Sequence, residues 1–420
     1  MNRFTKLAAT GRKWLGILGP GLVTGASDDD PSGIATYSQA GARFGLATLW
    51  TALLTFPLMA AIQEMCARIG LTTSQGLTST LKQHYPKALL YIMMLFSFPA
   101  ITLNIGADIQ GMGAVANMIF PTIPTNAFSV FFTALLMFII IKYPYRKIAG
   151  ILKWLCLSLL LYMIVPFTVK QDWGMVLKNT FVPTIQFNKD FISLLVALLG
   201  TTISPYLFFW QATMEVEDMS HKKKQVVVNK RVLSDMRTDV NIGMFLSNLV
   251  MFFIILTAGS ILYNSGVRQI DTINEAARAL EPLTGSLTHL TFALGVLGTG
   301  LIALPVLAGS QSYMIAETFG WTEGLDKLFP QAKSFYMSVI LSLMVGLSLD
   351  FFGISPIKAL LYSAILYGLT APVLIAIILH IGNNKKIMKE NTNSALSNLL
   401  GFTTLILMTA AAVALLYLLF

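Results

Sequence analysis

Residues 19–34 read GPGLVTGASDDDPSGI and interrupt the first long apolar segment of the chain. Three successive aspartates, Asp28 to Asp30, are followed directly by Pro31. Proline lacks an N–H and clashes with the preceding turn, so we expect a helix break near residue 30. Inside a membrane, an opened turn and a carboxylate both need a partner. The stretch therefore predicts a cation site within a broken helix. The alternative is that the aspartates lie just beyond a short span, among the lipid headgroups.

The composition indicates a membrane protein. Of the 420 residues, 55% are hydrophobic and only 12% are charged, whereas soluble domains carry roughly 25% charged residues. Apolar runs of about 20 residues recur along the chain, which is typical of a polytopic all-α bundle. We expect eleven spans, at residues 15–42, 47–70, 88–118, 126–142, 148–168, 191–217, 239–262, 287–314, 334–350, 357–381 and 396–420.

The net charge of +9 is distributed unevenly along the chain. If the N-terminus is cytoplasmic, 22 of the 29 lysines and arginines fall on the inner side and 7 on the outer side. This bias is the positive-inside pattern, so we expect a multi-pass protein of the cell membrane with a cytoplasmic N-terminus and an extracytoplasmic C-terminus. The basic cluster at residues 221–224 then reads as a cytoplasmic anchor rather than a nucleic-acid site. No leader that would be cleaved is expected.

A second interruption occurs at residues 200–206, GTTISPY, where Pro205 breaks another apolar run. Five expected spans begin with each break. Two interrupted segments in corresponding positions are typical of transporters built from inverted repeats, with the substrate site where the breaks meet. We expect one transmembrane domain over residues 1–420, with repeats at 15–168 and 191–381 and an additional helix at 396–420.

Polar residues beyond the two breaks extend the candidate site. Ser204, Gln211 and Glu215 share one helical face that leads from the second break toward the inner side, which suits an exit path for a cation. Alternatively, Glu215 and the acids Glu217 and Asp218 that follow it pair with the basic loop at residues 222–231. In the third span, Asn104 and Asp108 share a face, and Asp108 reads equally well as a functional or a structural carboxylate.

At these breaks the sequence resembles the Nramp family of divalent metal transporters. The resemblance rests on Gly19-Pro-Gly21, Asp30-Pro31, residues 39–42, Asp108 and Pro205, and it implies the LeuT-type five-plus-five fold. It also implies that Asp30 binds the metal. The family's Asn corresponds to Gly33, its Met to Ser204, its Ala to Thr201 and its His to Tyr206.

These departures from the family pattern bear on the transported ion. A thioether suits softer transition metals, whereas hydroxyl and carboxylate oxygens suit Mg²⁺, which keeps several of its waters. The pattern is similar to the Nramp-related magnesium transporters, so we expect Mg²⁺ as the main substrate, with Mn²⁺ also carried. The expected metal site consists of Asp29, Asp30, Gly33, Thr201, Ser204, Gln211 and Glu215.

The family's proton route is only partly present. Asp108 remains, but the family's Glu three residues later corresponds to Gly111, and residues 334–349 carry no charge. We therefore expect transport without proton coupling. The main alternative is a proton-coupled Mn²⁺ or Fe²⁺ transporter of the Nramp type.

Other classes of function fit the sequence less well. A sodium-coupled amino-acid transporter shares the fold, but three aspartates would repel a substrate carboxylate. An enzyme is not expected, because no nucleotide loop, nucleophile elbow or paired His/Glu motif is present. Cys66 and Cys156 lie in apolar spans without metal-ligand spacing. We expect no catalytic residue, no cofactor, no nucleic-acid partner, and a monomer in the lipid bilayer.

Overall fold

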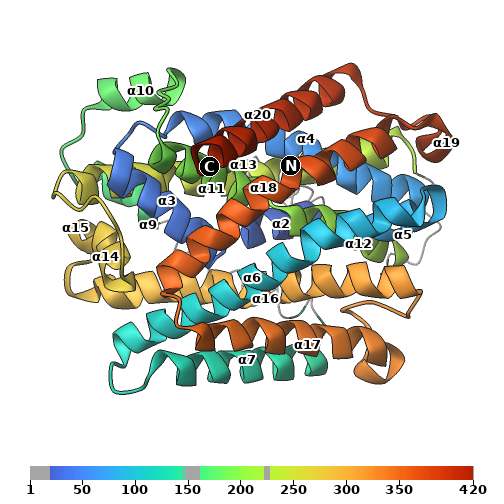
Figure 1. Ribbon diagram of the computed structural model, residues 1–420, viewed down its shortest axis with the longest axis horizontal. Helices are drawn as coiled ribbons and strands as arrows, with labels where there is room; N and C mark the ends of the chain where they lie inside the picture. Colours follow the sequence, from blue (N-terminus) through green and yellow to red (C-terminus); the bar gives the residue numbers. More distant parts are fainter. Residues whose placement is uncertain (1–18, 145–146, 148–160, 222–227, 420) are drawn as a thin grey trace, which may run out of the picture.

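A computed structural model describes residues 19–144, 147, 161–221 and 228–419. The fifth expected span, the basic cluster at residues 221–224 and Cys156 fall largely or wholly outside this part of the chain. The described regular structure is helical (Figure 1), which confirms the expected all-α class. Its α-helices are α2 Pro20–Asp28, α3 Pro31–Phe44, α4 Trp50–Thr73, α5 Leu77–His84, α6 Lys87–Ile119, α7 Thr125–Lys142, α9 Leu161–Ile164, α10 Trp173–Phe181, α11 Lys189–Thr202, α12 Pro205–His221, α13 Lys230–Ala258, α14 Ile273–Ala277, α15 Glu281–Thr284, α16 Thr288–Phe319, α17 Lys333–Leu349, α18 Pro356–Asn383, α19 Lys385–Met388 and α20 Ala395–Leu419.

Within the described residues, nine segments are long and apolar enough to cross a membrane. The broken first span, α2 with α3, consists of two short helices, and the fifth span is mostly not described. One boundary expectation was wrong. Helix α13 begins at Lys230, nine residues before the expected start, because the Asn229 side chain caps the backbone amides of Arg231 and Val232. The helix thus extends beyond its apolar part.

The two broken helices lie at the centre of the bundle. Helix α2 packs on α13, α12 and α16, and α3 packs on α13, α18 and α11. Helices α6, α16, α17 and α7 form one side of the molecule, and α20 runs along the other side against α18, α11 and α4 (Figure 1). This arrangement surrounds both breaks with helices.

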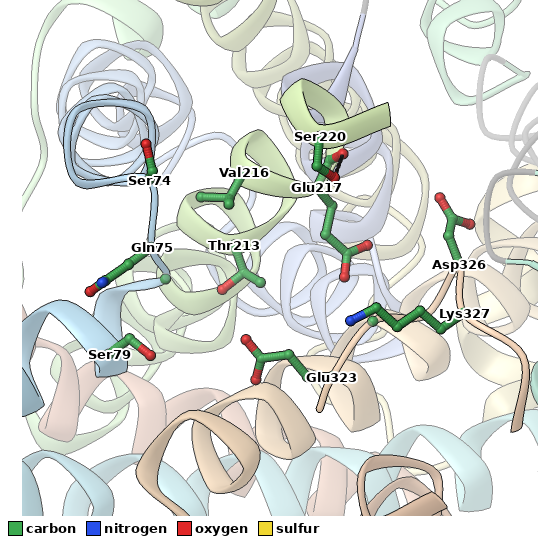
Figure 2. A pocket seen from close by; sticks show the side chains of 12 residues that line it. Ser74, Gln75, Ser79, Thr213, Val216, Glu217, Ser220, Glu323, Asp326 and Lys327 are labelled. Carbon is green, nitrogen blue, oxygen red and sulfur yellow. Dashed lines mark hydrogen bonds between the residues drawn. The ribbon is translucent and has the colours of Figure 1, made fainter. Parts of the chain in front are cut away.

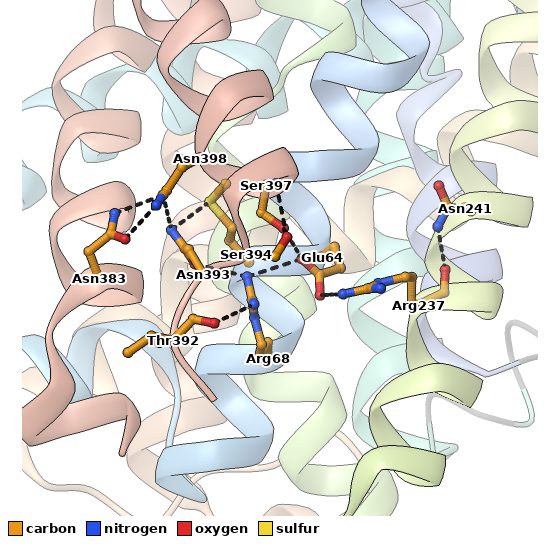
Figure 3. A network of polar contacts seen from close by, with 11 residues as sticks. Glu64, Arg68, Arg237, Asn241, Asn383, Thr392, Asn393, Ser394, Ser397 and Asn398 are labelled. Atoms are coloured by element: carbon orange, nitrogen blue, oxygen red, sulfur yellow. Dashed lines mark hydrogen bonds and ion pairs between the residues drawn. The ribbon is translucent and has the colours of Figure 1, made fainter. Parts of the chain in front are cut away.

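A polar network ties α20 to the rest of the bundle (Figure 3). Arg68 forms an ion pair with Glu64 one turn earlier on α4, at 3.1 Å, and both side chains are buried. The i, i+4 spacing places the two side chains on the same face of α4. Arg237 of α13 reaches the other Glu64 oxygen at 3.3 Å. Arg68 also donates to Asn393 at 2.8 Å, just before α20, and Ser397 of α20 donates to Glu64 at 3.5 Å.

Candidate metal site

The first break lies where the sequence predicts it. Helix α2 ends at Asp28 and α3 begins at Pro31. Asp30 is the N-cap of α3, and its Oδ1 accepts a hydrogen bond of 2.7 Å from the Gly33 amide. Proline fits the first helical position because that position needs no N–H donor. The backbone thus fixes the Asp30 carboxylate at the break.

The second oxygen of Asp30 binds a helix that is distant in sequence. Asn104 of α6 donates to Oδ2 at 2.9 Å, and Ser363 of α18 donates to the Asn104 amide oxygen at 2.9 Å. Asp30 is only 2% exposed. Sequence reasoning noted Asn104 but missed Ser363, since a lone serine in an apolar helix gives no signal.

All three aspartates of the first stretch are buried. Asp28, Asp29 and Asp30 are 0%, 4% and 2% exposed. This contradicts the alternative that they lie beyond the span among headgroups. It also shows that Asp30 is not the only carboxylate at the break, because Asp28 ends α2 and Asp29 forms the turn.

The two breaks face each other. A Cβ added at Gly33 would lie 3.5 Å from Oγ1 of Thr201, at the end of α11. The Tyr206 hydroxyl at the start of α12 donates to the Ser27 carbonyl near the end of α2, at 2.8 Å. Ser204 lies in the second break, where its hydroxyl donates to the Thr201 carbonyl at 2.7 Å. The side chains of Tyr206 and Ser204, both at the second break, therefore satisfy backbone carbonyls that have no partner within a helix.

Gln211 and Glu215 lie further along α12. At about 1.5 Å rise per residue, Glu215 is roughly 16 Å from Ser204 along the helix axis. Gln211 donates to Glu215 at 2.9 Å and accepts from Thr24 of α2. Both are buried. These two residues join α2 to α12 on the side predicted to be cytoplasmic, which suits a path or a closed gate rather than direct contact with an ion held at Asp30.

Asp108 and Asp350 are buried carboxylates that lie outside the breaks. Asp108 on α6 is fully buried, and neither of its oxygens has a hydrogen-bond partner within the described structure. Asp350 follows α17 directly and is 5% exposed, also without a hydrogen-bond partner there. Asp350 was missed because it lies one residue beyond the uncharged stretch that the sequence analysis considered.

The start of α2 is held by α13. Asp239 accepts hydrogen bonds from the backbone amides of Gly19 at 2.8 Å and Gly21 at 2.7 Å, and also from Leu22. The residue before α2 is Gly19, which has no side chain to cap the helix. Asp239 therefore supplies the missing cap and places a negative charge at the positive end of α2.

A separate polar pocket of about 370 Å³ lies between the ends of α4 and α12 and the loop after α16 (Figure 2). Glu217, Glu323, Asp326 and Lys327 line it. Burial raises the pKa of the Glu323 carboxyl to about 9, with the negative charges of Glu317 and Glu217 adding to the effect. The pocket opens on the side predicted to be cytoplasmic.

Among the described residues, no group of three or more His, Cys, Asp and Glu side chains is placed to hold one metal ion. A cation at the breaks would therefore rely on one or two carboxylates together with carbonyls, hydroxyls and water. Such hard oxygen donors suit Mg²⁺, Ca²⁺ and Mn²⁺. Asp30, Asp29, Gly33, Thr201 and Ser204 are the predicted site residues that the fold brings to the breaks.

Two interrupted helices that face each other within a bundle of long apolar helices define a multi-pass membrane protein of the broken-helix type. The family model "Nramp: Natural resistance-associated macrophage protein-like" matches residues 21–418. The chain belongs to this family.

Individual relatives agree with this assignment. The divalent metal cation transporter MntH of Caldanaerobacter subterraneus subsp. tengcongensis is 24% identical over 394 residues, which cover 93% of this chain and 90% of the relative. The manganese transporter of Eremococcus coleocola matches with a TM-score of 0.78 at 16% identity, over 97% of this chain and 87% of that one. Mhp1, a nucleobase-cation-symport-1 family transporter, matches with a TM-score of 0.55 at 14% identity, over 96% and 92%. These structural likenesses show the shared fold.

Proposed function

We propose that this protein carries a divalent metal cation across the membrane by alternating access, with Asp30 as the charged ligand. The observation that carries the proposal is the position of Asp30, which is buried between two broken helices and oriented by Gly33 and Asn104. A buried carboxylate at a helix break is a functional site by default in a membrane protein. The relatives named as divalent metal and manganese transporters support the same class of substrate.

The donor atoms at the breaks favour Mg²⁺ as the main ion, with Mn²⁺ also carried. Ser204 stands where the family has a methionine, and its hydroxyl, like that of Thr201, is a hard oxygen donor. Gly33 stands where the family has an asparagine, which leaves room for a cation that keeps part of its water shell. Gln211 and Glu215 would then line the route away from the breaks.

Proton-coupled Mn²⁺ uptake is the second candidate, and the comparisons favour it over the magnesium proposal. A solved structure that matches with a TM-score of 0.78 is named a manganese transporter. Asp108, which the family uses for proton movement, is present and fully buried beside the site. The missing Glu at Gly111 and the absence of charged residues at positions 334–349 of α17 are the arguments for uncoupled transport.

Flux in proteoliposomes decides between the two candidates. Vesicles containing the purified full chain would report Mg²⁺, Mn²⁺ and internal pH in parallel. Mg²⁺ entry without acidification supports the magnesium proposal. Acidification that tracks Mn²⁺ entry, with little Mg²⁺ flux, establishes the alternative. No flux of either ion would contradict divalent cation transport itself.

A further inference from the structure

A groove of about 480 Å³ lies between α18 and α20, far along the chain from both breaks. The chain leaves α18 at Asn383 and enters α20 at Ala395, so the two helices meet at these ends and pack side by side (Figure 1). This is the end of the bundle that is predicted to be cytoplasmic. The groove is lined by Ala376, Leu379, His380, Asn383, Asn398, Phe402 and Leu405. None of these residues belongs to the candidate metal site.

The lining of the groove changes from polar to apolar along its length. At the helix ends, Asn383 and Asn398 exchange hydrogen bonds of 2.8 and 2.7 Å (Figure 3). Ala376 lies seven residues before Asn383 on α18, about 10 Å along the helix axis, and Phe402 and Leu405 face it from α20. A phospholipid has the same order, with its polar headgroup at the surface and its acyl chains further in. The groove therefore suits an acyl chain.

Positive charge gathers at the polar end of the groove. Lys385 and Lys386 lie on the short helix α19, which joins α18 to α20, and Lys389 follows directly. All three side chains are exposed. Glu390 is the one acid in the sequence of residues 380–393. Basic residues at the cytoplasmic end of membrane helices attract the phosphate of anionic lipids, so this end of the groove favours a negatively charged headgroup.

His380 adds a hydrogen-bonding group to the same end of the groove. The Tyr85 hydroxyl, between α5 and α6, lies 2.8 Å from its Nδ1, and the two rings meet edge to face. This contact orients the imidazole, while Nε2 has no hydrogen-bond partner among the described residues. When the Tyr85 hydroxyl donates to Nδ1, the neutral ring carries its proton on Nε2 and donates from there. A phosphate oxygen in the groove would accept this hydrogen bond.

We propose that the groove between α18 and α20 is a binding site for an anionic phospholipid. One acyl chain lies between the two helices, and the phosphate lies beside Lys385, Lys386 and His380. A second copy of this chain is a poorer occupant, because a symmetric contact would bring the same lysines of both copies together. The inference goes beyond the proposed function and does not depend on which ion is carried.

Native mass spectrometry of the purified, delipidated full chain in detergent tests the site. The protein would be titrated with phosphatidylglycerol or phosphatidylcholine of the same acyl chains. We expect the first phosphatidylglycerol to bind at least tenfold more tightly than the first phosphatidylcholine. The Tm would be measured in parallel with each lipid and with glycerol phosphate, since a ligand that binds only the folded state raises Tm. Glycerol phosphate, which has no acyl chain, should leave Tm unchanged.

The double variant Lys385→Gln with Lys386→Gln tests the contribution of the headgroup. It should weaken phosphatidylglycerol binding at least fivefold and leave phosphatidylcholine binding unchanged. The matched control is Lys230→Gln with Arg231→Gln. It removes the same charge from two adjacent, exposed residues at the start of α13, on the same side of the bundle. This control should bind both lipids as the wild type does.

Ala376→Phe tests the groove itself, because it fills the apolar part without a change of charge. It should weaken binding of the first phosphatidylglycerol at least tenfold. Ala410→Phe is the control, since Ala410 is an exposed residue of α20 that does not line the groove. If Ala376→Phe does not fold, the lysine variants, which change only exposed residues, still test the proposal.

Four results would overturn the lipid site. The first is equal affinity for the two lipids, and the second is an equal loss of binding in both lysine double variants, which would indicate general surface charge. The third is a rise in Tm with glycerol phosphate that matches the rise with phosphatidylglycerol, which would indicate a site for free phosphate. The fourth is a dimer mass that Ala376→Phe abolishes, which would assign the groove to a second copy of the chain.

Discussion

At the level of single residues, Asp30 has two separable tasks. It caps α3 through the Gly33 amide, and it presents a negative charge between the two breaks. Asparagine also caps helices well, so replacing Asp30 by Asn keeps the first task and removes the second. The surrounding contacts from Asn104 hold the side chain in place in either case.

We expect Asp30→Asn to fold normally and to lose divalent cation transport by at least tenfold, which corresponds to about 1.4 kcal/mol or more of lost interaction with the ion. Flux in proteoliposomes and Tm in detergent would be measured together. Asp172→Asn is the control, since Asp172 caps the exposed start of α10 in the same manner. Flux from Asp30→Asn equal to that of the wild type would exclude Asp30 as the charged ligand.

Gly33 and Ser204 control which ion fits the breaks. A Cβ at Gly33 would lie 3.2 Å from the Asp28 carbonyl and 3.3 Å from the Tyr37 ring, so a larger side chain narrows the space. We expect Gly33→Asn with Ser204→Met to lose Mg²⁺ transport and to gain binding of Mn²⁺ or Cd²⁺, because a thioether binds softer metals. Each single change should have a smaller effect.

Calorimetry on the purified double variant would measure this change in preference. Thr370→Val, which alters a hydroxyl of α18 that donates to its own helix, is a control for general effects of substitution in the bundle. A double variant that folds and keeps the wild-type order of affinities would place selectivity elsewhere, for example at Thr201 and Tyr206.

At the level of elements, α2 depends on a neighbouring helix for its first turn. Asp239 of α13 satisfies three backbone amides at residues 19, 21 and 22. The other end of α2 is held by Tyr206, and its middle by the contact of Thr24 with Gln211. Opening a path from the two breaks to the side predicted to be cytoplasmic would require α2 to lose these contacts.

We therefore expect Asp239→Ala to release the first turn of α2. Loss of a helix cap costs about 0.5–2 kcal/mol, and the amides of residues 19–28 should exchange with solvent correspondingly faster in hydrogen-exchange measurements. Asp235→Ala, one turn earlier on α13 and exposed, should not change this exchange. Equal protection of α2 in both variants would show that Asp239 does not hold the helix.

The loop after α16 contains Glu323, a carboxyl outside the membrane-spanning helices whose pKa is raised by burial. In the folded state Glu323 keeps its proton up to about pH 9, whereas its usual pKa is 4.5. The folded state thus binds more protons than the unfolded state between these values, so the stability that this group contributes is fully present below pH 4.5 and is lost as pH rises through about 9.

We expect the Tm of the wild type to fall more steeply between pH 7 and 9.5 than that of Glu323→Gln, which stays neutral. Glu390→Gln, at an exposed position, is the control and should follow the wild-type curve. Parallel curves for wild type and Glu323→Gln would contradict the buried, protonated state of this carboxyl in the polar pocket.

At the level of the whole molecule, the sequence predicts the helical class, both breaks and most span positions, because proline and apolar length act locally. It does not predict which helices surround Asp30. Asn104 and Ser363 lie 259 positions apart, and Asp239 lies 217 to 220 positions from the amides that it caps at the start of α2. No local pattern encodes these pairings. Asp350 and the early start of α13 were missed because polar residues lie at the edge of apolar runs.

The network around Glu64 acts on the molecule as a whole, since it joins α4, α13 and α20 (Figure 3). Glu64→Gln would leave the buried Arg68 guanidinium without its anion. Removal of one partner of a buried pair costs about 3–5 kcal/mol, so we expect a clear fall in Tm and faster hydrogen exchange at the start of α20. Arg237→Gln should have a smaller effect, because that side chain is 56% exposed.

The matched control for the Glu64 prediction is Arg278→Gln. It removes an ion pair with Glu281 at 3.9 Å whose side chains are 59% and 62% exposed, and exposed pairs contribute about 0–1 kcal/mol. If Glu64→Gln lowers the Tm no more than Arg278→Gln does, the network does not stabilise the fold. Helix α20 also packs against α18 and α11. If the Tm falls while hydrogen exchange at α20 stays unchanged, this packing, and not the Glu64 network, holds α20 in place.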